Sequence, residues 1–442
     1  MRAVGFLLLS LLAVGSAGAA DLLQIYREAV DNDPSFAGAR ASADAGREKQ
    51  AQGLAGLLPS LTLSGNTVWN ENELRIGQTA TVKPHYNSNS YSATLSQPLF
   101  RWQNWVQYGQ GRHQAALAEA QLQQARQDLI LRVAQAYFDV LYAEENLRAL
   151  EANKAAIAQQ LEAAKKNFEV GTSTITDTHE AQARYDLAVA QEIGAQSELE
   201  VRRRALQSII GREPGALAQV KPDAKLLPPV PAEMNRWVEA AENGSFTVQI
   251  QQANAEIADL EVSKQRAGHY PTLDLVANAG RNRAVSSGVP PTPLETDFQS
   301  IGLQLSLPLF QGGLVMSRDR EAVANRAAAQ ASLEAARRAA VLSARQNFLG
   351  VVNGLAQLRA LAAAKLSSQS ALESNKLGYE VGVRINIDVL NAENQVYQTR
   401  RDFAKAALDT LMAQLKLKAS VGALAEDDLV QANGLLDPAS AR

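Results

Sequence analysis

The side chains best suited to polar chemistry lie in two similar stretches, each centred on a Glu-Val-Gly triplet. The first stretch contains the acceptors Thr176 and Asp177, and the second contains the donors Tyr379 and Arg384. A guanidinium and a phenol can both donate hydrogen bonds to a hydroxyl or a carboxylate. We therefore predict polar links from Tyr379 and Arg384 to Thr176 and Asp177, provided that the two stretches pack side by side.

A simpler interpretation explains the same residues without any link between the stretches. Asp177 and Asp388 fall in the predicted first turn of a helix, where a carboxylate is stabilising whatever its function. Arg384 and Asp388 are also four residues apart, a spacing that allows a local ion pair on one helix. The sequence leaves both interpretations open.

Both stretches belong to one long internal repeat. Residues 146–211 recur at 357–422 with a constant offset of 211 and no gap. Solenoid repeats have periods of about 20–50 residues, so this longer period indicates a duplicated half-protein. Gly171 and Gly382 occupy the same place in the two copies, and a glycine there allows one helix to end and the next to reverse direction.

Apolar residues predict a long helical hairpin around each of these turns, over residues 102–211 and 313–422. From Leu129 to Phe168 they follow the heptad spacing that is typical of coiled coils, and the second copy repeats this spacing from Ala344. A second apolar stripe lies beside the first. Two stripes indicate helical neighbours on both sides, as in a ring of helices.

Four strands are predicted ahead of the hairpins, over about 57–70, 88–100, 270–282 and 298–310. Apolar and polar residues alternate along them, so that one face of each strand is apolar and the other is polar. Their lengths match the roughly 9–11 residues that a tilted strand needs to cross a bilayer. A two-hairpin surface sheet on a soluble protein would show the same alternation.

The remaining segments complete the expected organisation of the chain. Met1 and Arg2 precede a short apolar run and several small residues, a pattern typical of a secretory signal peptide. We expect these segments in order: signal peptide 1–20, first structural repeat 21–211, proline-rich linker 212–230, second structural repeat 231–422 and C-terminal tail 423–442.

Composition excludes several classes of function. The chain has no cysteine, which excludes disulfides, thiolate chemistry and a lipid attached to cysteine. The net charge is −3 and the basic residues are scattered, so we expect no nucleic-acid partner. The four histidines (85, 113, 179, 269) are widely separated, and no phosphate-binding loop occurs. We therefore expect no enzyme, no metal site and no cofactor, and His179 is expected to be an ordinary surface helix residue.

Four strands per chain are too few for a closed barrel, since natural membrane barrels need about eight. Two chains would supply eight strands and three would supply twelve. The long helices of such an assembly would form a hollow cylinder continuous with the barrel, which indicates a conduit.

The chain resembles the TolC family over nearly all of residues 21–425. The resemblance rests on the signal peptide, the duplicated order of elements, the Pro-Leu-Phe strand ends at Phe100 and Phe310, and above all residues 379–391. It implies an α+β membrane protein, a homotrimer with one twelve-stranded outer-membrane β-barrel continuous with a long periplasmic α-helical barrel. The implied function is an exit duct for tripartite efflux or type I secretion. The implied partners are a periplasmic adaptor, an inner-membrane pump or ABC transporter, and outer-membrane lipid.

The resemblance also implies a role for the polar residues of the turns. Links among Thr176, Asp177, Tyr379 and Arg384 would hold the periplasmic entrance closed. Asp388 would form a ring of three carboxylates in the pore, weakened here because Asn391 stands where family members often carry a second Asp. A periplasmic adaptor would normally contain one hairpin rather than two, and a purely structural coiled coil would not explain the four strands.

Overall fold

The computed structural model describes residues 20–76, 80–83, 85–221, 225–285 and 292–437. The expected signal peptide, apart from Ala20, lies outside the described residues, as do parts of the expected linker and tail. The chain divides into two compact units. Unit 1 comprises residues 1–39, 123–245 and 339–442, and unit 2 comprises residues 40–122 and 246–338.

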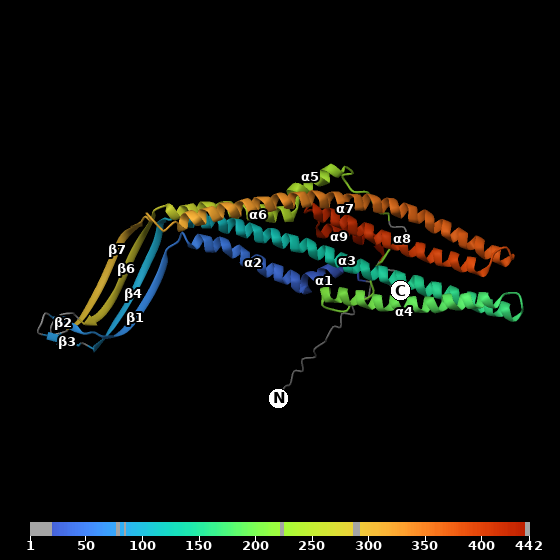
Figure 1. The fold of residues 1–442 in the computed structure, drawn as a ribbon, viewed down its shortest axis with the longest axis horizontal. Helices are drawn as coiled ribbons and strands as arrows, with labels where there is room; N and C mark the ends of the chain where they lie inside the picture. Colours follow the sequence, from blue (N-terminus) through green and yellow to red (C-terminus); the bar gives the residue numbers. More distant parts are fainter. Residues whose placement is uncertain (1–19, 77–79, 84, 222–224, 286–291, 438–442) are drawn as a thin grey trace, which may run out of the picture. The chain divides into compact units, whose positions relative to one another are not determined.

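Helices account for most of the described chain (Figure 1). They are α1 (Leu22–Asn32), α2 (Pro34–Ala55), α3 (Trp102–Glu169), α4 (Ile175–Ile210), α5 (Met234–Gly244), α6 (Phe246–Arg266), a 3₁₀ turn (Ala267–His269), α7 (Leu314–Glu380), α8 (Asn386–Ser420) and α9 (Glu426–Asn433). Within the described residues, no helix is both long enough and apolar enough to cross a membrane.

A four-stranded antiparallel sheet forms the strand-built part of unit 2, in the order β1-β4-β6-β7 (Figure 1). Its strands are β1 (Ser60–Glu71), β4 (His85–Phe100), β6 (Thr272–Val285) and β7 (Pro293–Ser306). Unit 2 also contains a small sheet of β2 (Leu74–Ile76) with β3 (Ala80–Val82), and unit 1 contains a small sheet of β5 (Gln219–Val220) with β8 (Leu436–Asp437).

The register of the four-stranded sheet sorts its side chains onto two different faces. One row across the strands consists of Leu61, Leu95, Ala277 and Ile301, and the next row consists of Thr62, Thr94, Asn278 and Ser300. Directly opposed residues share a face and successive rows alternate between faces, so these two rows lie on an apolar and a polar face. Farther along the strands the first face also carries charged pairs, such as Arg281 with Asp297. Leu61 is 72% exposed and Ile301 is 74% exposed, so the apolar face is uncovered in a single chain.

The turns of the two helical hairpins lie in unit 1 and have the same local geometry. Hairpin one is α3 with α4, and hairpin two is α7 with α8. The ends of α3 and α7 and the starts of α4 and α8 are each separated by 211 residues. Gly171 has φ 78° and Gly382 has φ 76°, left-handed values that glycine adopts without strain.

The backbone bonds at the two turns also match. Gly171 N donates to Phe168 O and Gly382 N donates to Tyr379 O, both at 3.0 Å. The pattern of bonds that caps the end of the first helix in each hairpin is therefore repeated from copy to copy.

The core of unit 1 lies beside the buried stripe of α3. Leu129, Ile130, Val133 and Tyr137 of this helix are all fully buried. The Tyr137 hydroxyl lies within hydrogen-bonding distance of two backbone carbonyl oxygens, at 3.2 Å and 2.9 Å, and so joins α3 to the start of the described chain and to the segment before β5.

Candidate functional site

At the turn of hairpin one, Asp177 bonds to its own helix start. Its Oδ2 accepts hydrogen bonds from Ser173 Oγ at 2.6 Å, from Thr174 N at 3.0 Å and from Thr174 Oγ1 at 2.9 Å. Asp177 N donates in return to Thr174 Oγ1, which completes a capping box. The bond from Ser173 first, and those from Thr174 next, lower the pKa of Asp177 despite partial burial. Thr176, one residue earlier, is exposed.

At the turn of hairpin two, Arg384 also has a local partner. Its Nη1 lies 3.7 Å from Asp388 Oδ2, and the Arg384 side chain is 59% exposed. The side chain runs along Gly378, where an added Cβ would lie 2.7 Å from Arg384 Cγ. Among the described residues of a single chain, the predicted bonds from Arg384 to Thr176 and Asp177 are not formed. The local interpretation therefore describes how both carboxylates are bonded within one chain.

Two hydrogen bonds do connect the hairpins, and they involve two residues that sequence analysis missed. Asn167 Nδ2 donates to the Tyr379 hydroxyl at 3.3 Å, and Arg184 Nη2 donates to Asn391 Oδ1 at 3.0 Å. Tyr379 and Asn391 are predicted site residues, whereas Asn167 and Arg184 are not. A comparison of the two copies could have drawn attention to Asn167 and Arg184, because the copies differ there. At the offset of 211, Gly378 corresponds to Asn167 and Gln395 corresponds to Arg184.

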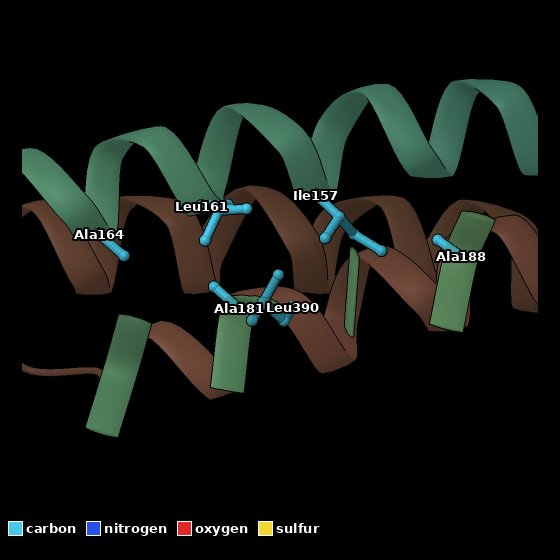
Figure 2. Close-up of a cluster of buried hydrophobic side chains, with 6 residues drawn as sticks. All are labelled: Ile157, Leu161, Ala164, Ala181, Ala188 and Leu390. Atoms are coloured by element: carbon cyan, nitrogen blue, oxygen red, sulfur yellow. The ribbon is translucent and has the colours of Figure 1, made fainter. Parts of the chain in front are cut away.

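Apolar packing reinforces this boundary between the hairpins. Figure 2 shows Leu390 of α8 beside α3 and α4 of hairpin one. Leu390 is 3% exposed, and Ile387 packs against the same cluster. The members of this cluster on hairpin one are Ile157, Leu161, Ala164, Ala181 and Ala188. Within one chain, therefore, the hairpins are joined by both apolar and polar contacts.

A shallow groove of about 370 Å³ runs along hairpin two, and we call it the hairpin-two groove. It contains three of the predicted site residues, Arg384, Asp388 and Asn391. Its full lining is Ser368, Ala371, Asn375, Arg384, Asp388, Asn391, Ala392 and Gln395. Six of the eight lining residues have polar side chains, in contrast to the apolar cluster of hairpin one.

Hairpin two also contains a buried charge. Glu393 is 2% exposed, and its Oε1 lies 2.9 Å from Lys376 Nζ across the hairpin. Its Oε2 and both polar side-chain atoms of the buried Asn386 have no hydrogen-bond partner in the described part of the chain. A buried carboxylate with a single partner depends strongly on that partner. In the same described part, no group of three or more metal-ligating side chains occurs.

Comparison with known proteins assigns the chain to a family. The family model described as "Outer membrane efflux protein" matches residues 25–212 and 237–423. The outer membrane protein TolC of Vibrio cholerae is 32% identical over 417 residues, which cover 94% of this chain and 93% of that protein. The proteases secretion protein PrtF of Dickeya chrysanthemi is 32% identical over 427 residues, which cover 95% and 92%.

Solved structures agree on the fold. The Campylobacter jejuni CmeC outer membrane channel has a TM-score of 0.80 at 17% identity and covers 94% of this chain and 90% of its own. The outer membrane protein VceC of Vibrio cholerae has a TM-score of 0.78 at 20% identity and covers 91% and 96%.

The resemblance to the TolC family is thus confirmed, as is the expected fold class of long helices with a four-stranded sheet. The family match decides against the two alternatives, a periplasmic adaptor and a purely structural coiled coil. The chain belongs to the outer membrane efflux protein family, and it is a channel protein of the outer membrane rather than an enzyme.

Proposed function

We propose that three copies of this chain form an exit duct through the outer membrane for efflux or type I secretion. The observation that carries the proposal is the four-stranded sheet with one uncovered apolar face and two edge strands, β1 and β7. Unpaired edges and an exposed apolar face are both unfavourable in water. Pairing β1 of one copy with β7 of the next would satisfy the edges, and lipid would cover the apolar face.

The polar face of the sheet suits an aqueous passage. Its rows consist mainly of Ser, Thr and Asn residues, and Thr94 Oγ1 donates to Asn278 Oδ1 at 2.8 Å. Among the described residues of the four strands, Asp274 is the one charged residue of this face. Arg101 binds it with two hydrogen bonds, at 2.7 Å and 2.6 Å. Such a wall would offer hydrogen bonds to water and cargo while carrying little net charge.

The gate of this duct lies at the helical turns. Arg384 is exposed and its contact with Asp388 is long, so little is lost when it changes partner. In a ring of alternating hairpins, Arg384 of one copy meets Thr176 and Asp177 of the next. Tyr379 holds the two hairpins of one copy together through Asn167. Three copies of Asp388 would then surround the narrow end of the duct and favour cations.

The names of the relatives suggest the partners and the cargo. PrtF is named for secretion of proteases, and the 32% identical AprF of Pseudomonas aeruginosa for secretion of alkaline protease. The 25% identical BepC of Brucella suis is named as an outer membrane efflux protein. We infer that this chain acts with a periplasmic adaptor and an inner-membrane pump or ABC transporter, which supply the energy that a passive duct lacks.

Fractionation followed by electrical recording tests the proposal. We expect the full chain in the outer membrane fraction as a detergent-stable trimer that forms channels in planar bilayers. The double variant Arg384→Ser, Asp177→Ala should enlarge the single-channel conductance. Arg338→Ser is a matched control, because Arg338 is an exposed α7 residue that pairs with Glu334 on its own helix. A soluble periplasmic monomer would refute the duct, and unchanged conductance in the double variant would refute the gate alone.

A further inference from the structure

Hairpin one has a space that a side chain of hairpin two fills, whereas the corresponding space on hairpin two is an open groove. On hairpin one, Leu390 fills the space lined by Leu161, Ala164 and Ala181. The offset of 211 places Leu372, Asn375 and Ala392 at the same positions on hairpin two. Asn375 and Ala392 line the hairpin-two groove. The groove is therefore the counterpart of a site that is filled on hairpin one.

The repeat also identifies the residue that would fill the groove. Leu390 lies at the eighth position after Gly382, and His179 lies at the eighth position after Gly171. The two turns share their helix ends and their backbone conformation, so His179 projects from α4 as Leu390 projects from α8. Leu390 is 3% exposed, whereas His179 is exposed to solvent. Within the described residues of one chain, His179 does not line this groove.

We propose that His179 of one protomer occupies the hairpin-two groove of the next protomer and lies there beside Asp388. The inference rests on the trimeric ring proposed above, and it adds a residue that the second copy contributes to the gate. In a closed ring the contact of hairpin one with hairpin two inside a chain must alternate with a contact between chains. The duplicated sequence makes these two contacts equivalent in backbone geometry but different in chemistry.

The groove offers one carboxylate to an incoming histidine. Asp388 and Arg384 are the charged residues of the lining, and the Lys376–Glu393 pair lies on the same hairpin. On α4 itself, Asp177 and Glu180 are the acidic neighbours of His179.

Exchange of partners at the new contact gives two opposite-charge pairs. When Arg384 turns to Asp177 of the neighbouring protomer, it leaves Asp388 to face His179 of that protomer. Histidine as a residue type gains a positive charge in acidic solution, so the second pair becomes an opposite-charge pair as the pH falls. Acidification should therefore strengthen closure, and raising the pH should weaken it.

One polar link within a chain cannot be repeated between protomers. The Asn167–Tyr379 bond has no counterpart there, because the equivalent residues are Gly378, which has no side chain, and Phe168, which has no hydroxyl. A histidine takes the place of the buried Leu390.

Cysteine cross-linking tests this placement, and the chain is suited to it because it contains no cysteine. The variant His179→Cys, Asn375→Cys should form a disulfide between protomers, so that the oxidised trimer remains linked in denaturing electrophoresis. The matched control is Leu390→Cys, Ala164→Cys, the equivalent pair within one chain, which should yield only an internally linked monomer. The proposal would be overturned if the test variant formed only an internally linked monomer and the control linked protomers. It would also be overturned if the test variant formed no link between protomers while the control pair did form its disulfide.

Electrical recording tests the charge pairing with His179 intact. Lowering the pH from 7.5 to 5.5 should raise the ratio of closed to open wild-type channels about tenfold, since three weakly stabilising pairs act together. His179→Gln and Asp388→Asn should each abolish that rise. A pH response that survives in His179→Gln would overturn the pairing. If the wild-type chain forms no trimer at all, the proposed duct fails instead, and the two failures are thereby distinguished.

Discussion

Removing Lys376 should loosen hairpin two more than removing its partner Glu393. In the pair, the Glu393 side chain is 3% exposed and the Lys376 side chain is 46% exposed. Lys376→Met leaves the buried Glu393 carboxylate with no hydrogen-bond partner. Lys376 is the partner of its Oε1 atom, and its Oε2 atom has none among the described residues. Glu393→Gln instead leaves an ammonium group that can turn into water. The two single substitutions break the same bond with different consequences.

The magnitude follows from the burial of each partner. Breaking a fully buried ion pair by deleting one side costs about 3–5 kcal/mol. Water already reaches Lys376, which weakens the attraction, so we expect about 2 kcal/mol for Lys376→Met. Glu393→Gln should cost about 1 kcal/mol, the scale of one hydrogen bond. The double variant Lys376→Met, Glu393→Leu should be close to neutral, since it removes both charges and fills the space with apolar atoms.

Hydrogen exchange measured by mass spectrometry reports this local loosening. A loss of about 2 kcal/mol accelerates exchange by local opening about 30-fold, so amides near the start of α8 should exchange that much faster in Lys376→Met. Hairpin one supplies the internal reference. Lys405→Met is the control, because Lys405 is an exposed α8 residue with no ion pair among those described. Equal exchange in Lys376→Met and wild type, or faster exchange in Glu393→Gln than in Lys376→Met, would refute the reasoning.

Three further predictions concern other polar contacts of unit 1. Burial alone raises the pKa of Asp33, but the hydrogen bonds from Arg132 and a backbone amide outweigh it and lower that pKa. The stability from this pair is present above the unfolded pKa of about 3.9 and is lost as the pH falls through the lower folded pKa. Arg132→Met should therefore cost about 2 kcal/mol at pH 7, with a gap to wild type that narrows below about pH 4 in thermal unfolding. Tyr137→Phe should lower stability by about 1–2 kcal/mol in the same assay, because the one hydroxyl proton that two buried carbonyls share is lost. Asn391→Asp should strengthen the block of the channel by multivalent cations. The increase should be larger when Arg184→Ala is added, because that change removes a cation that would neutralise the new carboxylate. Unchanged block in both variants would contradict the carboxylate ring.

The fold class was predictable because its signals are local. Heptad spacing on α3, alternation on β6 and β7 and a glycine at each turn are properties of short segments, and each segment has one geometry that buries its apolar side. The duplication strengthened these signals, since every feature of one hairpin could be checked against the other. The resemblance carried by residues 379–391 then supplied the assembly that a single chain does not contain.

Partners across the hairpins could not be predicted in the same way. Which residue meets Tyr379 depends on how far one hairpin is shifted along the other, and no short segment encodes that shift. Asn167 and Arg184 resemble solvated helix residues in the sequence, and they become linkers only after the hairpins pack. The predicted bond of Arg384 is not formed within one chain because both side chains have local partners. Asp177 accepts hydrogen bonds from Ser173 and Thr174, and Arg384 lies beside Asp388.

A ring built from a duplicated hairpin needs the two copies to be alike in shape, because unlike hairpins would not alternate around one axis. It also needs them to be unlike in chemistry if it is to open at defined places. Ile387 and Leu390 pack against hairpin one of the same chain, whereas their equivalents Thr176 and His179 are exposed. Apolar contacts resist separation because separation exposes them to water, whereas polar side chains regain hydrogen bonds to water when they part. In the proposed trimer, water would thus favour separation at the three boundaries between chains and oppose it at the three boundaries within chains. We therefore expect the positions at which the copies differ to decide where the proposed ring opens, and those at which they agree to decide that it can close.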